Sequence, residues 1–341
     1  MRVKRATIKD VAQKAGVSIS AVSYVLNNTP GQSIPETTRI KVLNAAKELQ
    51  YTPNSIARGM RTKRSMSIGL VSFWNVTDHV FNEIIAGVSK VADQNDYNIV
   101  FCNLNSDKRE FSYLELYKRQ QIDGILFISP YEFRDGFDEN VHVGKIKELK
   151  IPAVILNAYN QDDSVSSIYI DYFSTTYTAA EYLINLGHKE IGYLLPNAYQ
   201  LDQVQAVERL KGYRAALDDY GMTLNENNIF FIDKVGEITD RIQAGKGPTA
   251  IVANKTTYAQ MFMKSMLDKG IRVPEQISVI AANNEPCAPF LYPSLTAIQL
   301  PLVEMGERGA QILIDSIDKK VSHMKVKLPN SIIERDSCKK L

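Results

Sequence analysis

The sequence predicts two fold classes in one chain: a small all-α head, followed by an α/β core of two doubly wound parallel-sheet lobes. Up to about residue 50, apolar residues recur at helical spacing behind helix-start signals. From residue 67 onward, apolar runs of strand length alternate with helical patterns. Lysine and arginine dominate the first part, whereas acidic residues are in excess in the second. We therefore expect two separately built parts.

The first helix is predicted to begin at Thr7. Thr7 and Asp10 are spaced as a capping box, in which each side chain satisfies a backbone donor of the first turn. Gly16 can take the positive φ angle that ends a helix at little steric cost. The small apolar face consists of Val11, Ala12 and Ala15.

Two more helices are predicted behind Gly16. Ser18 is a good N-cap for the second, whose apolar residues are Val22, Val25 and Leu26. Ser33 and Glu36 repeat the capping-box spacing before the third, with Pro35 tolerated in its first turn. Its apolar residues recur at three-residue spacing and then close the unit: Ile40, Leu43, Ala46, Leu49 and Tyr51.

The first two helices and their tight turn form a helix-turn-helix over residues 7–28. In such a unit the second helix enters the major groove of DNA and presents its N-terminal half to base edges. The alternative is a small helical domain that binds another partner. Charge favours DNA: residues 1–65 hold 12 of the 40 basic and 3 of the 38 acidic residues, a net charge of +9, which leaves −7 for residues 66–341.

Composition excludes several other classes. No stretch approaches the ~20 apolar residues of a membrane span, and the N-terminus has no apolar signal core, so we expect a cytoplasmic chain with no membrane partner. Cys102, Cys287 and Cys338 are few and far apart, and the four histidines are scattered. We therefore expect no disulfide framework, no metal site and no cofactor.

The core is predicted from alternating strands and helices. The strands are expected at 67–73, 97–104, 124–129, 153–157, 167–171, 190–195, 229–233, 249–254 and 277–283. The helices are expected near 80–95, 108–121, 172–187, 203–221, 256–270 and 303–318. Continuous apolar strands between helices indicate parallel sheets that are covered on both faces.

So many strands exceed one ordinary sheet, and polar residues cluster at 160–166. Two doubly wound lobes are the simplest solution, with a ligand between them at the carboxyl ends of the strands. The same architecture hosts many enzymes. We expect no catalysis, because the sequence has no glycine-rich dinucleotide motif after a strand, no phosphate-loop lysine motif and no nucleophile elbow.

The head and the segment behind it carry specific motifs at 7–12, 15–18, 22–23, 25–27 and 51–58. In these motifs the chain resembles the lactose-repressor (LacI/GalR) family of bacterial transcription regulators. Weaker landmarks follow in order through the core, at 68–71, 123–125, 186–188, 209–213 and 277–280. The resemblance covers essentially the whole chain.

Family members are dimers or tetramers that bind palindromic operators. They respond to a small molecule, usually a sugar or a nucleobase, held in a core that resembles periplasmic binding proteins. The resemblance thus implies a homodimeric repressor of sugar uptake or metabolism genes, with a sugar or sugar phosphate as effector. Some relatives instead bind a protein corepressor, and a nucleobase is a further alternative. The tail has no leucine heptad, so a tetramer is not expected.

The resemblance also implies a division of the chain. Residues 1–52 would be the DNA-binding head, 53–65 the hinge and 66–341 the core. The N-lobe would comprise about 66–162 and 295–322, and the C-lobe about 163–294 and 323–341.

The resemblance assigns contacts with DNA. Ile19, Ser20 and Tyr24 occupy the positions that touch base edges. Where Tyr24 stands the family often has arginine, so we expect a different operator base there, because a tyrosine ring suits a thymine methyl and arginine reads guanine. Backbone contacts are expected from Thr7, Ser18, Ser23, Asn27, Tyr51 and Asn54.

The hinge would act in the minor groove. Asn54 can cap a helix over 55–61, but about seven residues are too few to be helical alone, because ~12 to 15 are normally needed. Its folding should therefore be coupled to DNA. By resemblance Met60 is the apolar wedge between base pairs, beside Ala57 and Arg58. The alternative is a flexible basic linker.

The resemblance places the effector among Asp171, Arg209 and Asn254, and Arg209 matches the arginine that binds the effector in the family. Asn283 and Trp74 are further candidates. Trp74 follows the first strand where a stacking platform would lie; the alternative is that this lone aromatic packs in the core. The sequence departs from the family here: Tyr172 and Lys255 replace its usual asparagine and aspartate, and Asn283-Asn284 replaces its usual aspartate pair. The cleft is therefore expected to be less acidic. This favours an anionic ligand such as a sugar phosphate; the alternative is that the family's response to neutral sugars has been lost.

Overall fold

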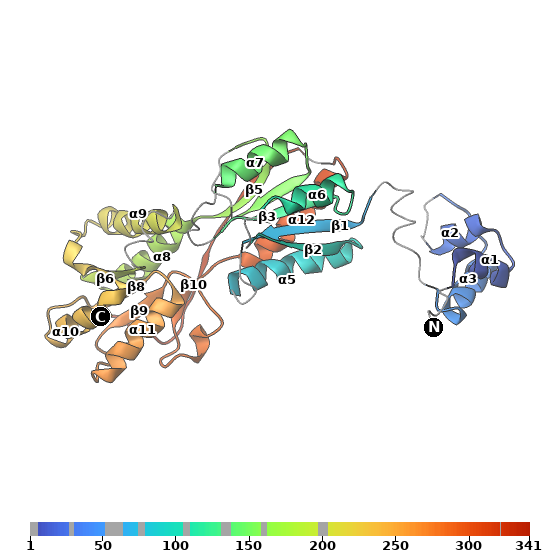
Figure 1. The fold of residues 1–341 in the computed structure, drawn as a ribbon. Helices are drawn as coiled ribbons and strands as arrows, with labels where there is room; N and C mark the ends of the chain where they lie inside the picture. The colour runs from blue at the N-terminus through green and yellow to red at the C-terminus, as the bar shows by residue number, and fades with distance from the viewer. Residues whose placement is uncertain are drawn as a thin grey trace. The chain divides into compact units, whose positions relative to one another are not determined.

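The computed structural model describes residues 6–26, 31–51, 64–73, 79–104, 110–130, 138–157, 162–196, 204–320 and 322–341. Its contacts divide the chain into two compact units, Met1–Met66 and Ser67–Leu341. The first unit is the helical head and the second is the α/β core (Figure 1). The fold class predicted from the sequence is confirmed. The predicted hinge helix over 55–61 lies outside the described residues.

The first helix of the head, α1 (Ile8–Ala15), has the predicted capping box. The Thr7 amide donates to Asp10 Oδ2 at 2.7 Å, and the Asp10 amide donates to Thr7 Oγ1 at 3.4 Å. Gly16 ends the helix in the left-handed region, with φ of 65°. Local sequence signals therefore set both ends of α1.

Ser18 caps α2 (Ile19–Leu26), because its Oγ accepts a hydrogen bond from the Ala21 amide at 3.1 Å. The third helix is α3 (Glu36–Glu48). Each helix is too short to be stable alone, so they share one core. The buried members of that core come from all three helices: Val11, Ala12, Val22, Val25, Val42, Ala45 and Ala46.

Two predictions for the third helix are wrong. Pro35 itself is the N-cap of α3, with no side-chain cap, so Glu36 is the first helical residue and the box with Ser33 does not form. Ile40 and Leu43, expected in the core, are 51% and 48% exposed. A strict three-residue spacing drifts around a helix that has 3.6 residues per turn, whereas Val42, Ala45, Ala46 and Leu49 follow the true stripe.

The first lobe of the core is built on a six-stranded sheet with the order β11-β5-β4-β3-β1-β2. All its strand pairs are parallel. The strands are β1 (Ser67–Ser72), β2 (Asn98–Asn103), β3 (Gly124–Ile128), β4 (Ala153–Leu156), β5 (Ser166–Ile170) and β11 (Lys325–Leu328). Its helices are α5 (His79–Gln94), α6 (Ser112–Lys118), α7 (Glu139–Glu148) and α12 (Leu302–Ile317).

The second lobe is built on a six-stranded sheet with the order β12-β10-β9-β8-β6-β7. Its pairs are parallel except β10 with β12. The strands are β6 (Ile191–Leu195), β7 (Ile229–Phe231), β8 (Ala250–Ala253), β9 (Ser278–Ala281), β10 (Thr296–Gln299) and β12 (Ser331–Ile333). The helices are α8 (Tyr172–Asn185), α9 (Val204–Asp219), α10 (Val235–Gln243) and α11 (Thr256–Asp268), with 3-10 turns at 226–228, 232–234 and 288–290.

Both faces of the second sheet are apolar, as the continuous strand runs predicted. Successive residues of β8 point to opposite faces of the sheet and so belong to different cores. Ile251 lies in a cluster with α10 and α11, and Val252 lies in a cluster with α8 and α9. A two-sided core of this kind explains why the strands lack polar alternation. Figure 1 shows one helix pair on each side of this sheet.

Three strands belong to a different lobe from the one that the sequence predicted for them. β5 continues the first sheet beside β4, β10 belongs to the second sheet, and β11 returns to the first. The boundary between the lobes was predicted at 160–166, one strand too early, because β5 still belongs to the first sheet. The chain first passes to the second lobe between Ile170 and Tyr172. The chain crosses again between β10 and α12, and finally between β11 and β12. Polarity of a loop does not reveal strand pairing, which is a long-range property.

Candidate nucleic-acid interface and ligand site

The exposed side of α2 carries residues predicted to contact bases. Ile19 is 44% exposed, which is unusual for an isoleucine in a short helix, and Ser20 is also exposed. Tyr24 and Ser23 are half-buried, one turn further on. The opposite side of α2 is closed off, because Val22 and Val25 are buried in the head. The three predicted base-contacting residues therefore belong to one helix, as a groove-reading helix requires.

Two of the predicted backbone contacts lie at helix starts. Thr7 and Ser18 are the caps of α1 and α2, and both are exposed. A helix N-terminus carries a partial positive charge, so hydroxyls at that place suit phosphate oxygens. Tyr51 follows α3 and is half-buried. Five predicted positions lie outside the described residues: Asn27, Asn54, Ala57, Arg58 and Met60.

The structure brings Arg209 and Asn254 together in the second lobe. Arg209 lies on α9 and is only 1% exposed. Its Nη1 donates to the carbonyl of Asn254 at 2.9 Å, and its Nη2 donates to the carbonyl of Ala282 at 3.4 Å. Asn254 and Ala282 directly follow β8 and β9, so Arg209 spans the carboxyl ends of two neighbouring strands. That edge is where open α/β sheets bind ligands.

An aromatic ring faces the same guanidinium. The centre of the Arg209 guanidinium lies 5.1 Å from the centroid of the Tyr172 ring, which is a cation–π distance. Tyr172 is the first residue of α8 and is buried. Sequence reasoning treated this tyrosine only as a departure from the family, because its contact with α9 could not be read locally.

Asn254 and Asn283 have partners within the protein. Asn254 Oδ1 accepts a hydrogen bond from the Tyr193 hydroxyl at 2.8 Å. Asn283 Oδ1 accepts from the Thr256 amide at 2.7 Å and so serves the start of α11. Its Nδ2 donates to Glu285 Oε1 at 3.1 Å. Asn283 thus holds a helix end in place beside the site.

Asp171 is also engaged. Its carboxylate caps α8 by accepting from the Ser174 amide at 3.1 Å, and it forms an ion pair with Lys327 of β11. The hydrogen bond to Asp171 raises the pKa of Lys327 above its ordinary value. The pair reduces the acidity of this position. Trp74, the remaining predicted effector residue, lies outside the described residues.

Two contacts that the sequence did not reveal join the lobes. The Tyr172 hydroxyl donates to Asn157 Oδ1 at 2.6 Å, and Asn157 directly follows β4 of the first lobe. Gln205 Nε2 on α9 donates to the carbonyl of Pro130 at 3.5 Å. Asn157 was detectable as a polar residue at the end of an apolar run, and it takes a positive φ of 58°. Gln205 has no such local signal.

The described residues hold no group of three or more histidine, cysteine, aspartate or glutamate side chains that could bind a metal ion. They also contain no helix that is both long and apolar enough to cross a membrane. The arrangement around Arg209 combines hydrogen-bond donors with an aromatic ring, which are the groups that a site for a polar small molecule needs.

Comparison with known proteins identifies the family. Residues 7–54 match the family described as bacterial regulatory proteins, lacI family, and residues 180–338 match the periplasmic binding protein-like domain. The HTH-type transcriptional repressor PurR of Vibrio atlanticus (strain LGP32) is 32% identical over 346 residues, which cover 98% of this chain and 99% of the relative. The chain belongs to the lacI family of bacterial regulatory proteins. It is a DNA-binding transcriptional repressor of that family.

Solved structures show the same fold across this LacI-family chain. The lac repressor dimer bound to operator and the anti-inducer ONPF has a TM-score of 0.78 and 24% identity, over 98% of this chain and 99% of that one. The transcriptional regulator CelR in complex with cellobiose has a TM-score of 0.67 and 24% identity, over 98% and 100%. The predicted family and architecture are confirmed.

Proposed function

We propose that this repressor binds a palindromic operator through α2 and that a sugar or sugar phosphate at the Arg209 site controls that binding. The observation that carries the ligand part is the buried Arg209 guanidinium, which spans the carboxyl ends of β8 and β9. A guanidinium has five N–H donors, so it can hold two main-chain carbonyls and still contact a ligand. The structural relative CelR is in complex with cellobiose, a sugar.

Charge at the site supports an anionic ligand. The Asp171 carboxylate is paired with Lys327 and adds little net charge. Among the described residues, the Glu285 carboxylate accepts hydrogen bonds only from neutral groups in the site, Asn283 Nδ2 and the Thr257 hydroxyl, both at 3.1 Å, so its charge opposes the positive charge of Arg209. Lys255, which follows Asn254, adds a positive charge. Cationic side chains form their strongest hydrogen bonds with carboxylates and phosphates. We therefore favour a sugar phosphate over a neutral sugar.

The contacts between lobes supply a route for control. Tyr172 contacts both Arg209 and Asn157, so a ligand that moves the guanidinium also acts on a bond between the two lobes. A change in the angle between lobes would alter the spacing of the two hinge segments in a dimer. The ligand can act only through a difference in its affinity for the two arrangements.

The second lobe has a surface that suits a second copy of the chain. Phe290 and Tyr292 are 85% and 96% exposed, and with Met261 and Leu267 of α11 they border a shallow groove of about 440 Å³. Exposed aromatic residues of this size are typical of interfaces. A palindromic operator requires two heads related by a two-fold axis, which a homodimer supplies.

The decisive experiment titrates the full-length chain with a panel of sugars, sugar phosphates and nucleobases by calorimetry. We expect a sugar phosphate to bind and to change affinity for a duplex selected from a random pool. Arg209→Lys should weaken ligand binding about fiftyfold, because lysine cannot make the forked contacts. Arg214→Lys, on the exposed side of the same helix, is the matched control and should bind normally.

Four outcomes would change the proposal. Binding by a nucleobase alone would replace the sugar phosphate as effector. Heat from no small molecule would favour a protein corepressor. Equal ligand affinity in the Arg209→Lys and Arg214→Lys variants would remove Arg209 from the site, whereas loss of any salt-dependent preference among duplexes would contradict operator binding itself.

A further inference from the structure

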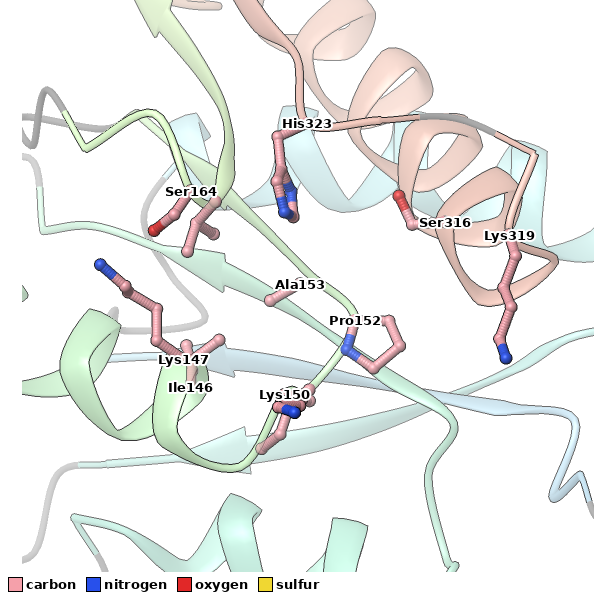
Figure 2. A pocket seen from close by; sticks show the side chains of 11 residues that line it. Ile146, Lys147, Lys150, Pro152, Ala153, Ser164, Ser316, Lys319 and His323 are labelled. Atoms are coloured by element: carbon pink, nitrogen blue, oxygen red, sulfur yellow. The ribbon is translucent and has the colours of Figure 1, made fainter.

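The first lobe contains a second concave site, which is separate from the Arg209 site. It is a cavity of about 470 Å³ at the edge of the first sheet where β4 and β5 begin. The carboxyl end of β4 leads instead to Asn157, which bonds Tyr172 beside Arg209. The two sites therefore lie at opposite ends of β4. Figure 2 shows the cavity between α7, α12 and the starts of these strands.

The floor of this cavity is apolar. It is formed where α7 ends and β4 and β5 begin, and its members are Ile146, Ile151, Pro152, Ala153 and Val165. Ile146, Ile151 and Ala153 are buried members of the first-lobe core, so the floor is fixed by packing. Such a floor favours a ligand with an apolar body, because contact between the two removes apolar surface from water.

The rim is cationic. Lys150 and Lys319 line the cavity from the ends of α7 and α12. The Lys150 amide donates to the Lys147 carbonyl at 3.0 Å, and the Lys319 amide donates to the Ser316 carbonyl at 3.0 Å. These helix-ending bonds hold both backbones at the rim. Within the part of the chain that the structure describes, no carboxylate forms an ion pair with either lysine.

Other polar groups line the walls. The Lys147 ammonium is 2.7 Å from Asp162 Oδ2, and its hydrogen bond is the main cause that holds the pKa of Asp162 well below its usual value. That pair contributes little net charge. In Figure 2 the His323 ring points into the cavity, between Ser164 and Ser316. The hydroxyls of both serines already donate, that of Ser164 to Asp162 Oδ1 at 2.5 Å and that of Ser316 to the Ile312 carbonyl at 2.7 Å. The histidine ring is therefore the wall group that can donate a hydrogen bond to an anion held by the lysines.

We propose that this cavity binds a small organic phosphate whose apolar part rests on the floor and whose phosphate meets Lys150 and Lys319. The lysines outnumber the acidic groups at the rim, and ammonium groups are suitable donors for phosphate oxygens. A volume of about 470 Å³ is within the range of small-molecule sites. The proposal does not depend on what binds at Arg209.

The cavity lies at the edge of the first sheet where the core begins. All strands of the first sheet run parallel, so β1 begins at the same edge as β4 and β5. β1 starts at Ser67, the first residue of the core. A bound phosphate would therefore lie at the end of the lobe where the chain enters, opposite the end that faces Tyr172.

Phenyl phosphate is a suitable probe, because it combines an anion with an apolar ring. We would titrate the full-length chain with phenyl phosphate, inorganic phosphate and phenol by calorimetry. We expect phenyl phosphate to bind more tightly than either of the others. Lys150→Gln with Lys319→Gln should lower its affinity about tenfold, which is about 1.4 kcal/mol.

The control pair Lys189→Gln with Lys246→Gln removes the same charge from exposed positions of the second lobe and should leave binding unchanged. The proposal is overturned if phenyl phosphate gives no heat, if phenol binds equally well, or if the Lys150 and Lys319 variant retains full affinity. Loss of phenyl phosphate binding in Arg209→Lys alone would assign the probe to the other site.

Discussion

Single residues have two kinds of role in this chain, and only one kind can be predicted from sequence. Thr7 and Ser18 cap helices through partners three residues away, so their spacing revealed the caps. Asp171 and Asn283 bond residues that are distant in the sequence, Lys327 and Thr256. The sequence therefore predicted which residues belong to the candidate site. It could not predict the residues that they bond, because those partners are distant in the sequence.

The base-reading role of Tyr24 can be tested by Tyr24→Ala. We expect the binding preference to relax at one symmetric pair of operator positions, because a single aromatic contact with a base is removed from each half-site. Asn44→Ala, at an exposed position of α3, is the control. An operator-selection experiment provides the measurement, and an unchanged preference in Tyr24→Ala would exclude this residue from base recognition.

His142 predicts a pH dependence of stability. It is fully buried, its Nδ1 lies 2.9 Å from the Tyr113 hydroxyl, and its Nε2 lies 3.4 Å from Glu110 Oε1. Burial lowers its pKa from 6.5 to about 4, although Asp138 opposes this shift; Lys145 adds to it. The unfolded chain therefore binds a proton between these values that the folded chain does not, and stability falls as pH falls.

We expect the wild-type chain to lose about 2 kcal/mol between pH 7 and pH 5 from this group. His142→Gln, which does not titrate, should show a correspondingly flatter profile even if it is less stable overall. Unfolding in urea at several pH values measures both profiles. Parallel profiles for the two proteins would show that His142 titrates normally in the fold.

At the scale of elements, the regular alternation was predictable and the last strands were not. Apolar runs predicted β1 to β9, and most of these strands, such as β3 and β8, are buried on both faces of their sheet. The short helices α7 and α10 and the strands β10 to β12 were missed. β11 and β12 face solvent in part and lie at sheet edges, so their sequences lack an apolar run. Only pairing with β5 and β10 identifies them.

Helix packing in the first lobe depends on two glycines. A Cβ atom on Gly306 of α12 would lie 2.1 Å from the carbonyl oxygen of Ile84, and one on Gly87 of α5 would lie 2.0 Å from that of Val303. Both contacts involve backbone, which cannot rotate away as a side chain does. The backbones of α5 and α12 therefore approach each other at a distance that only glycine permits.

Gly306→Ala should accordingly separate these helices and cost about 3 kcal/mol of stability through overpacking. Gly236→Ala on α10 is the matched control, because a Cβ atom there meets nothing within 4 Å. It should be neutral or stabilise by up to about 1 kcal/mol through helix propensity. Thermal unfolding compares the two, and an unchanged midpoint for Gly306→Ala would contradict the close approach.

At the scale of the whole molecule, the sequence predicted the head and a two-lobed core but assigned three strands to the wrong lobe. The chain crosses between the sheets three times, and each lobe is completed by a segment from the far end of the sequence. The composition of a loop does not indicate whether the chain passes from one sheet to the other there. The proposed dimer belongs to the same scale, because a palindromic operator engages two chains at once.

Tyr292→Glu tests the proposed dimer surface. A buried carboxylate at the centre of an apolar interface is strongly unfavourable, so we expect dissociation to monomers at micromolar concentration and loss of operator affinity. Val141→Glu, at an exposed position of α7, adds the same charge elsewhere and should remain dimeric. Sedimentation velocity measures the mass, and a dimeric Tyr292→Glu protein would place the interface on another surface.

The three crossings also determine the order of events on the ribosome. The head is translated first and has its own core, so it can fold while the rest is still being made. The first lobe cannot close until residues 302–328 have been synthesised, since they supply α12 and the edge strand β11. A nascent chain therefore carries a folded helical head well before its core is complete, and translation that stalls inside the core would leave that head attached to a lobe that cannot close.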